Sequence, residues 1–244
     1  MLENSRVPRI QWRSAILAGA LTIALTACGS DDDPLPEPSS AAVVVDVSGS
    51  VTEGTDLVAA AENRVAELID DIVLPGGTVV VKAAGSNTND RCVDLKFTVD
   101  AENDPVLDQV RNSAKRDLSA KFDGYIRCVE EFDTGGTQLF GLLSETAMNH
   151  PDATTWDVYT DGFDNHDTHG IGKLANLRDP DFPSAVVSGL HPALVPELSD
   201  DTTITWHFIG QGRDDLGSVE KHGLRQIFEL WTTATGASAS FVEN

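Results

Sequence analysis

Oxygen-bearing side chains occur in three short motifs whose residue types suit the coordination of a divalent cation. The first motif is Asp46-Val-Ser48-Gly-Ser50, the second places Thr137 after a pair of glycines, and the third is Asp161 followed by glycine. Mg²⁺ takes about six oxygen ligands in near-octahedral geometry. Three hydroxyls and two carboxylates can fill most of these positions, some through water. Each motif alone is more typical of a turn or a helix cap than of a ligand set.

Glycines beside these residues favour a close approach of the backbone to an ion. Gly49 lies between the two serines, and Gly135 and Gly136 precede the threonine. Glycine has no Cβ and reaches conformations that other residues avoid. We expect Mg²⁺ as the ion, and Mn²⁺ or Ca²⁺ could replace it because both also accept oxygen ligands. With only two charged ligands, such a site would tolerate a further carboxylate from another molecule.

The elements that must position these motifs alternate between short β-rich runs and amphipathic stretches. Strands are predicted at 41–46, 78–82, 92–98, 156–160, 202–209 and 238–242. Helices are predicted at 55–72, 104–118, 137–148 and 219–233, and the region around Cys128 either continues the second helix or begins another. This pattern predicts an α/β fold, Rossmann-like and doubly wound, with helices on both faces. Its mainly parallel sheet would have about six strands, one of them an antiparallel edge strand. Ligands of such sheets bind outside the carboxyl ends of the strands, where all three motifs fall.

Residues 163–200 interrupt this alternation, because they are rich in proline and poorly periodic. We expect an inserted loop region there, and long loops of this kind often face a partner. Within it, His166 and His169 lie among carboxylates. We interpret them as part of a solvated loop, with a second site for a softer cation such as Zn²⁺ as the alternative. His207 is expected to be a packed or edge histidine in a strand, and Trp156 and Trp206 are expected to serve the core.

Taken together, the five positions match the metal-ion-dependent adhesion site of the von Willebrand factor A (vWA) family, which residues 41–244 resemble. The resemblance is loosest over 85–130 and 163–200. It implies a divalent cation bound by Asp46, Ser48, Ser50, Thr137 and Asp161. It also implies a partner protein that donates an Asp or Glu carboxylate to the ion. The function expected from this resemblance is metal-dependent protein–protein interaction or adhesion, without catalysis.

Two other functions compete with this interpretation. A metal-dependent phosphohydrolase could use Asp46 as its nucleophile, but such enzymes carry a second aspartate where Ser48 stands. Neither the Gly-x-Ser-x-Gly elbow of serine hydrolases nor a P-loop occurs in the sequence. In the remaining alternative, the metal is purely structural and the loop at 163–200 makes the partner contacts.

The amino terminus has the three parts of an export signal. A basic stretch precedes an apolar run at 15–27, which is too short to form a stable membrane span. The run ends in Leu25-Thr26-Ala27-Cys28, which resembles the lipobox of bacterial lipoproteins. The resemblance implies a signal peptide at 1–27 and a lipid, such as palmitate, on Cys28. The chain would then be anchored at the outer face of the cell membrane, or in the outer membrane of a Gram-negative source. Residues 28–40 read as a flexible, acidic tether rich in proline and serine.

Cysteine pairing and net charge limit the remaining possibilities. With Cys28 lipidated, Cys92 and Cys128 are an even pair in an exported protein, which favours a disulfide over two buried thiols. The formal net charge is −22. Such a surface repels phosphate groups, so nucleic acid is excluded as a partner.

Overall fold

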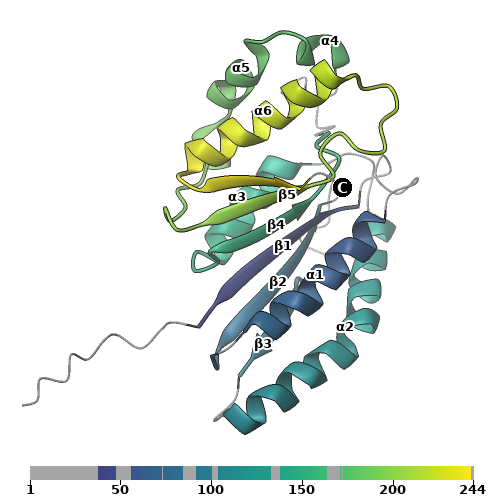
Figure 1. Cartoon of the computed structure of the whole chain (residues 1–244), viewed down its shortest axis with the longest axis vertical. Coiled ribbons are helices and arrows are strands. Elements are labelled where there is room, and N and C mark those ends of the chain that lie inside the picture. The colour runs from purple at the N-terminus through teal and green to yellow at the C-terminus, as the bar shows by residue number, and fades with distance from the viewer. Residues whose placement is uncertain are drawn as a thin grey trace, which may run out of the picture. The chain divides into compact units, whose positions relative to one another are not determined.

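A six-stranded sheet forms the centre of the fold (Figure 1). The computed structural model of the chain describes residues 38–47, 56–72, 74–84, 92–100, 104–132, 138–163, 171 and 173–242. All of them belong to Glu37–Asn244, one of the two units into which the chain divides. The strands are β1 (Ser40–Asp46), β2 (Gly77–Ala84), β3 (Leu95–Val99), β4 (Thr155–Tyr159), β5 (Thr203–His207) and β6 (Ser238–Val242).

The order of strands across the sheet is β3-β2-β1-β4-β5-β6. Every neighbouring pair is parallel except β2 and β3, which are antiparallel. The predicted fold class is therefore confirmed, including the antiparallel edge strand. Because β1 and β4 are parallel neighbours at the centre, their carboxyl ends lie side by side.

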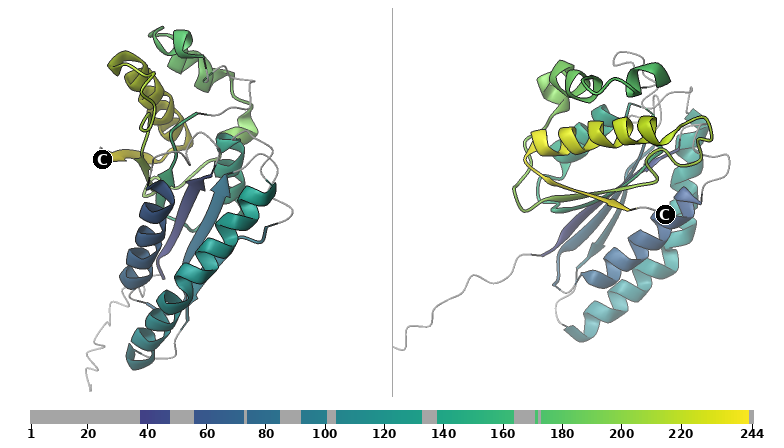
Figure 2. Two further views of the ribbon diagram at one scale, coloured as in Figure 1. Left: turned by 90° about the vertical axis from the view of Figure 1, so that its right-hand side faces the viewer. Right: turned by 45° about the horizontal axis from the view of Figure 1, so that its top comes forward.

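Helices cover both faces of this sheet (Figure 2). On one face, α1 and α2 pack against β1, β2 and β3. On the other face, α3 and α6 pack against β1, β4 and β5. The bounds of these helices are α1 Leu57–Asp71, α2 Asp104–Phe132, α3 Leu139–Asn149 and α6 Ser218–Thr235. None of the described helices is long and apolar enough to cross a membrane.

Strand β1 shows why the central strands are apolar along their whole length. Val43 and Val45 belong to the core beneath α1 and α2, whereas Ala42 and Val44 belong to the core beneath α3 and α6. Each of these four side chains is fully buried. A strand covered on both faces needs apolar residues at successive positions, and so a continuous run replaces the usual alternation.

Cys92 and Cys128 form a disulfide, as predicted from the sequence. It joins the segment before β3 to the last turns of α2. Helix α2 is continuous past Cys128, so the region around this cysteine extends the predicted helix and does not begin another. A cross-link over 36 residues of sequence contributes about 3–4 kcal/mol to stability in the loop-entropy account.

The described part of 163–200 differs from the loop expected there. It contains α4 (Leu174–Leu177), α5 (Phe182–Gly189) and the 3₁₀ turn η1 (Pro192–Leu194). Both α-helices pack on α6, which lies between them and the sheet (Figure 1). Leu177 and Val186 are buried in the same core as α6. Helices of four and eight residues are too short to produce a recognisable apolar period, which is why the sequence pattern did not reveal them.

Gly223 on α6 allows this close packing, which gives a testable prediction. A Cβ at this position would overlap the carbonyl oxygen of Leu177 in α4. We expect Gly223→Ala to lower the free energy of unfolding by about 1–3 kcal/mol through overpacking, measured by urea denaturation. Gly124 on α2 is the matched control, because a Cβ there meets nothing within 4 Å. Gly124→Ala should raise stability by up to about 1 kcal/mol, since alanine favours a helix. Equal effects of the two substitutions would contradict the packing account.

Candidate metal centre

Two of the five predicted ligands lie at the same edge of the sheet. Asp46 is the last residue of β1, and Asp161 follows β4 by two residues. Because β1 and β4 are parallel, with Val45 aligned with Tyr159, both aspartates come after the carboxyl ends of adjacent strands. Both are almost completely buried, with exposed fractions of 0% for Asp46 and 2% for Asp161. A carboxylate in such a position must be compensated by hydrogen bonds or positive charge.

Thr160 connects the two strand ends. Its hydroxyl donates a hydrogen bond of 2.7 Å to Oδ2 of Asp46. The same Oγ1 accepts a bond of 2.9 Å from the backbone N–H of Gly162. The sequence analysis missed this residue. Its signal was weak but present, since Thr160 is a hydroxyl residue that directly precedes a predicted ligand at a strand end.

The turn after β4 holds the carboxylate of Asp161 in place. Oδ1 of Asp161 accepts a hydrogen bond of 2.9 Å from the N–H of Phe163. Gly162 between them has φ +85°, a conformation that favours glycine. A Cβ on Gly162 would come within 2.9 Å of Phe228 and 3.1 Å of Leu224, both on α6. Glycine is therefore required here by both backbone conformation and close packing.

A positive charge lies beside this turn. The guanidinium of Arg213 stacks over the ring of Phe163, 4.0 Å from its centre. The pKa of Arg213 is raised, mainly by its hydrogen bond to Asp215 and to a smaller extent by the charge of Asp161. Arg213 thus contributes to the electrostatic compensation of the buried aspartate.

The remaining predicted ligands, Ser48, Ser50 and Thr137, lie outside the described residues, and so do Cys28 and the histidine pair His166 and His169. Within the ranges that the structure describes, no cluster of three or more His, Cys, Asp or Glu side chains suits a metal ion. The predicted site contains only two carboxylates, and its other ligands are hydroxyls. The cation site therefore stays a prediction for all five residues, of which the structure describes only Asp46 and Asp161.

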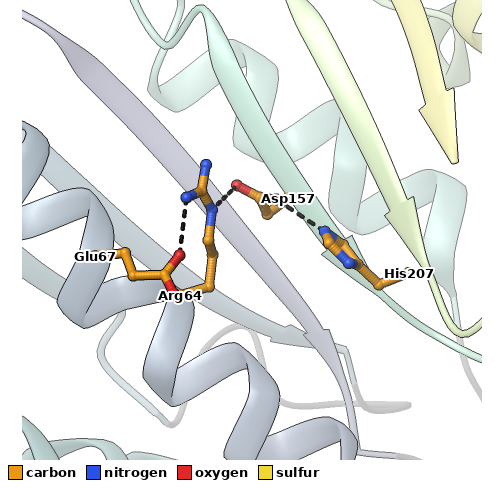
Figure 3. Close-up of polar contacts among 4 residues, drawn as sticks. All are labelled: Arg64, Glu67, Asp157 and His207. Atoms are coloured by element: carbon orange, nitrogen blue, oxygen red, sulfur yellow. Dashed lines mark hydrogen bonds and ion pairs between the residues drawn. The ribbon is translucent and has the colours of Figure 1, made fainter. Parts of the chain in front are cut away.

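A second polar cluster crosses the sheet on the face that α1 covers (Figure 3). Oδ1 of Asp157 on β4 lies 2.8 Å from Nε2 of His207 on β5, and Oδ2 accepts a 2.9 Å bond from Nε of Arg64 on α1. Arg64 also donates a 3.1 Å bond to Glu67. The ring of Tyr159 stacks on that of His207, with centres 4.3 Å apart. The expectation that His207 is packed is confirmed, and the two tryptophans are fully buried as expected.

Asp157 and Arg64 were not singled out from the sequence. Asp157 lies between two core residues of β4, and alternation places its side chain on the opposite face from theirs. Burial raises the pKa of Asp157, but the hydrogen bonds from His207 and Arg64 and the charge of Arg64 outweigh it. The pKa of this carboxyl therefore lies below its ordinary value, and the ionised form joins β4 to both β5 and α1.

Comparisons with known proteins add little to this description. No family model matches the sequence, and no curated protein sequence matches it. Among solved structures, the proximal thread matrix protein 1 from the mussel byssus is similar at a TM-score of 0.37 and 15% sequence identity. The match covers 84% of this chain but only 41% of that protein.

The depressed pKa of Asp157 predicts a pH-dependent contribution to stability. A carboxylate whose folded-state pKa is lowered stabilises the fold above its ordinary pKa of 3.8, and this contribution is lost as the pH falls through the folded-state value. Asp157→Asn should lower the free energy of unfolding by about 3 kcal/mol at neutral pH, measured by urea denaturation. The difference from the unsubstituted chain should shrink progressively in acid. Asp201→Asn, in the exposed turn before β5, is the control and should change stability little. A difference for Asp157→Asn that is independent of pH would contradict this role of its charge.

Proposed function

We propose that the chain is a lipid-anchored protein of the outer face of a membrane whose domain binds a divalent cation and thereby holds a partner protein. The observation that carries the proposal is the pair of buried carboxylates, Asp46 and Asp161, at the ends of two adjacent central strands. Thr160 and the turn at Gly162 orient them. The resemblance of the sequence to the vWA family supports the same function.

The chemistry of these donors fits a divalent cation. Two buried carboxylates at one sheet edge repel each other, and a cation between them would offset both the repulsion and the loss of hydration. Ser48, Ser50 and Thr137 would supply neutral oxygens, and Mg²⁺ is the expected ion, with Mn²⁺ or Ca²⁺ as substitutes. Metal-binding carboxylates are commonly oriented by hydrogen bonds from residues that do not contact the ion, and the bond from Thr160 to Asp46 would act in this way. A carboxylate of the partner would then complete the site.

The surroundings of Asp46 favour binding over catalysis. A phosphohydrolase would need a carboxylate oxygen that a substrate can reach. Asp46 has no exposed surface, and its Oδ2 accepts the hydroxyl of Thr160. A small ion can enter such a site more readily than a phosphate ester. We therefore prefer a binding module to an enzyme that uses Asp46.

Metal binding is the direct test of the cation site. We expect Asp46→Ala and Asp161→Ala each to lower the affinity for Mn²⁺ or Mg²⁺ by roughly 100-fold or more, because each removes one of two charged ligands. Thr160→Val should lower it by about 10- to 100-fold, since it frees Asp46 from its orienting bond. Isothermal titration calorimetry measures these affinities, and circular dichroism checks that the variants are folded.

Asp201→Ala removes the same charge in the turn before β5, at the amino ends of the parallel strands and away from the site. It should leave metal affinity unchanged. Capture of a partner in a crosslinked pull-down from native membranes should require Mg²⁺ and disappear with chelator. A partner that is captured equally well by Asp161→Ala would contradict the proposal. It would favour contacts made by the 163–200 region instead.

Lipid attachment is tested separately. We expect the unsubstituted chain to incorporate a labelled fatty acid and to sediment with membranes. Cys28→Ser should abolish both, because serine lacks the thiol that carries the acyl chain. Cys92→Ser together with Cys128→Ser leaves the lipid-carrying residue intact and should still incorporate label. Labelling of the Cys28→Ser chain would contradict the lipoprotein assignment.

A further inference from the structure

A pocket with basic walls lies at the β6 side of the sheet, beside the turn that follows β5. Its volume is about 380 Å³. Its floor includes Phe241, and three basic side chains from α6 line it: Lys221, His222 and Arg225. Among the described residues that line this pocket, none is acidic. We call it the basic pocket.

The charge of the basic pocket contrasts with that of the chain. The whole sequence has 39 acidic residues against 17 lysines and arginines, and its net charge is −22. Lys221 and Arg225 are four residues apart on one helix, where like charges repel. Lys221 lies in the first turn of α6, where positive charge is unfavourable. An anionic ligand at Lys221 would lessen both the cost of its position and its repulsion with Arg225.

The side chains of the basic pocket are positioned for such a ligand. The guanidinium of Arg225 lies over the ring of Phe241, 4.3 Å from its centre, and this contact limits its freedom. Lys221 and His222 are exposed, and neither takes part in an ion pair with another described residue. An anion that enters the pocket therefore meets one cation packed on an aromatic ring and one exposed cation. An anion that binds Lys221 does not have to displace an acidic side chain of another described residue.

The basic pocket adjoins the candidate metal centre through one turn. Gly210 has φ +69°, and a Cβ on it would come within 3.1 Å of Cγ of Lys221. The N–H of the same glycine donates a 2.9 Å hydrogen bond to the carbonyl oxygen of Asp161. Lys221 and the backbone of Asp161 thus both lie next to Gly210. A polypeptide bound at the metal centre would pass close to the pocket.

We infer that the basic pocket binds a carboxylate side chain of an acidic polypeptide, and that this polypeptide is the partner of the neighbouring metal centre. The second half of this inference rests on the proposed function, whereas the first half does not. The pocket suits an amino-acid side chain better than a bare inorganic anion, because Ile209, Phe241 and Val242 add apolar surface to its charged wall. The partner would then carry at least two acidic residues, one for the ion and one for the pocket.

The test uses the detergent-solubilised full chain and a fluorescent hexaglutamate peptide, with binding followed by fluorescence anisotropy at low salt. In chelator, where the metal centre cannot contribute, hexaglutamate should bind and a hexaglutamine peptide should not. Lys221→Gln or Arg225→Gln should weaken binding about threefold each, and the double variant about tenfold, as expected for partly exposed charge pairs. Lys96→Gln is the matched control, since Lys96 is exposed on β3 at the opposite edge of the sheet.

Several outcomes would overturn the inference. Unchanged affinity of the folded double variant in chelator would exclude the pocket, and an equal loss with Lys96→Gln would show only an effect of net charge. If inorganic phosphate displaces the fluorescent probe as well as unlabelled hexaglutamate does, the pocket binds a phosphate-bearing ligand and not an acidic polypeptide. Adding Mg²⁺ separates the two proposals. Asp161→Ala should lose the gain in affinity from Mg²⁺ but keep the binding seen in chelator. If Mg²⁺ gives no gain even in the unsubstituted chain, the metal proposal fails while the binding in chelator still tests the pocket.

Discussion

The hydrogen bond from Thr160 to Asp46 joins the ends of the two central strands, and the arrangement of the sheet edge depends on it. It compensates a carboxylate that has lost all contact with bulk water. It also sets the direction in which the chain leaves β4, because the same hydroxyl accepts the N–H of Gly162. That turn in turn orients Asp161. A single buried hydroxyl therefore bonds to groups at both strand ends, and buried polar groups of this kind are costly unless they are hydrogen-bonded.

Strand β4 and the turn after it carry three of the polar side chains described above. Asp157 points to the α1 side and is held by Arg64 and His207, while Thr160 and Asp161 follow at the carboxyl end. Asp157 is compensated by Arg64 and His207, and one carboxylate oxygen of Asp161 accepts the N–H of Phe163. Positive charge is added at the same end of the sheet by Arg213 and by the basic pocket on α6.

Much of the fold could be predicted from local patterns. The apolar run that ends at Asp46 indicated a central strand, and its burial on both faces confirms the reason. The even number of cysteines left after Cys28 indicated the bond between Cys92 and Cys128. The helices between 174 and 189 were missed, because four or eight residues leave too little periodicity to detect. Thr160 was missed because a threonine at a strand end is common and its partner is far away in the sequence.

By itself, the sequence determined the strands and the four long helices, the α/β class, the disulfide pairing and the position of Asp46 and Asp161 at strand ends. These features depend on neighbouring residues, whose spacing encodes burial and backbone conformation. Only the tertiary structure decided which strand ends meet. Thr160 bonds to Asp46 across 114 residues of sequence, and Asp157 bonds to Arg64 across 93. The basic pocket likewise needs α6 and β6 to lie together. Such contacts follow from strand order. Strand order depends on the packing of the whole chain, and so no local sequence pattern predicts it.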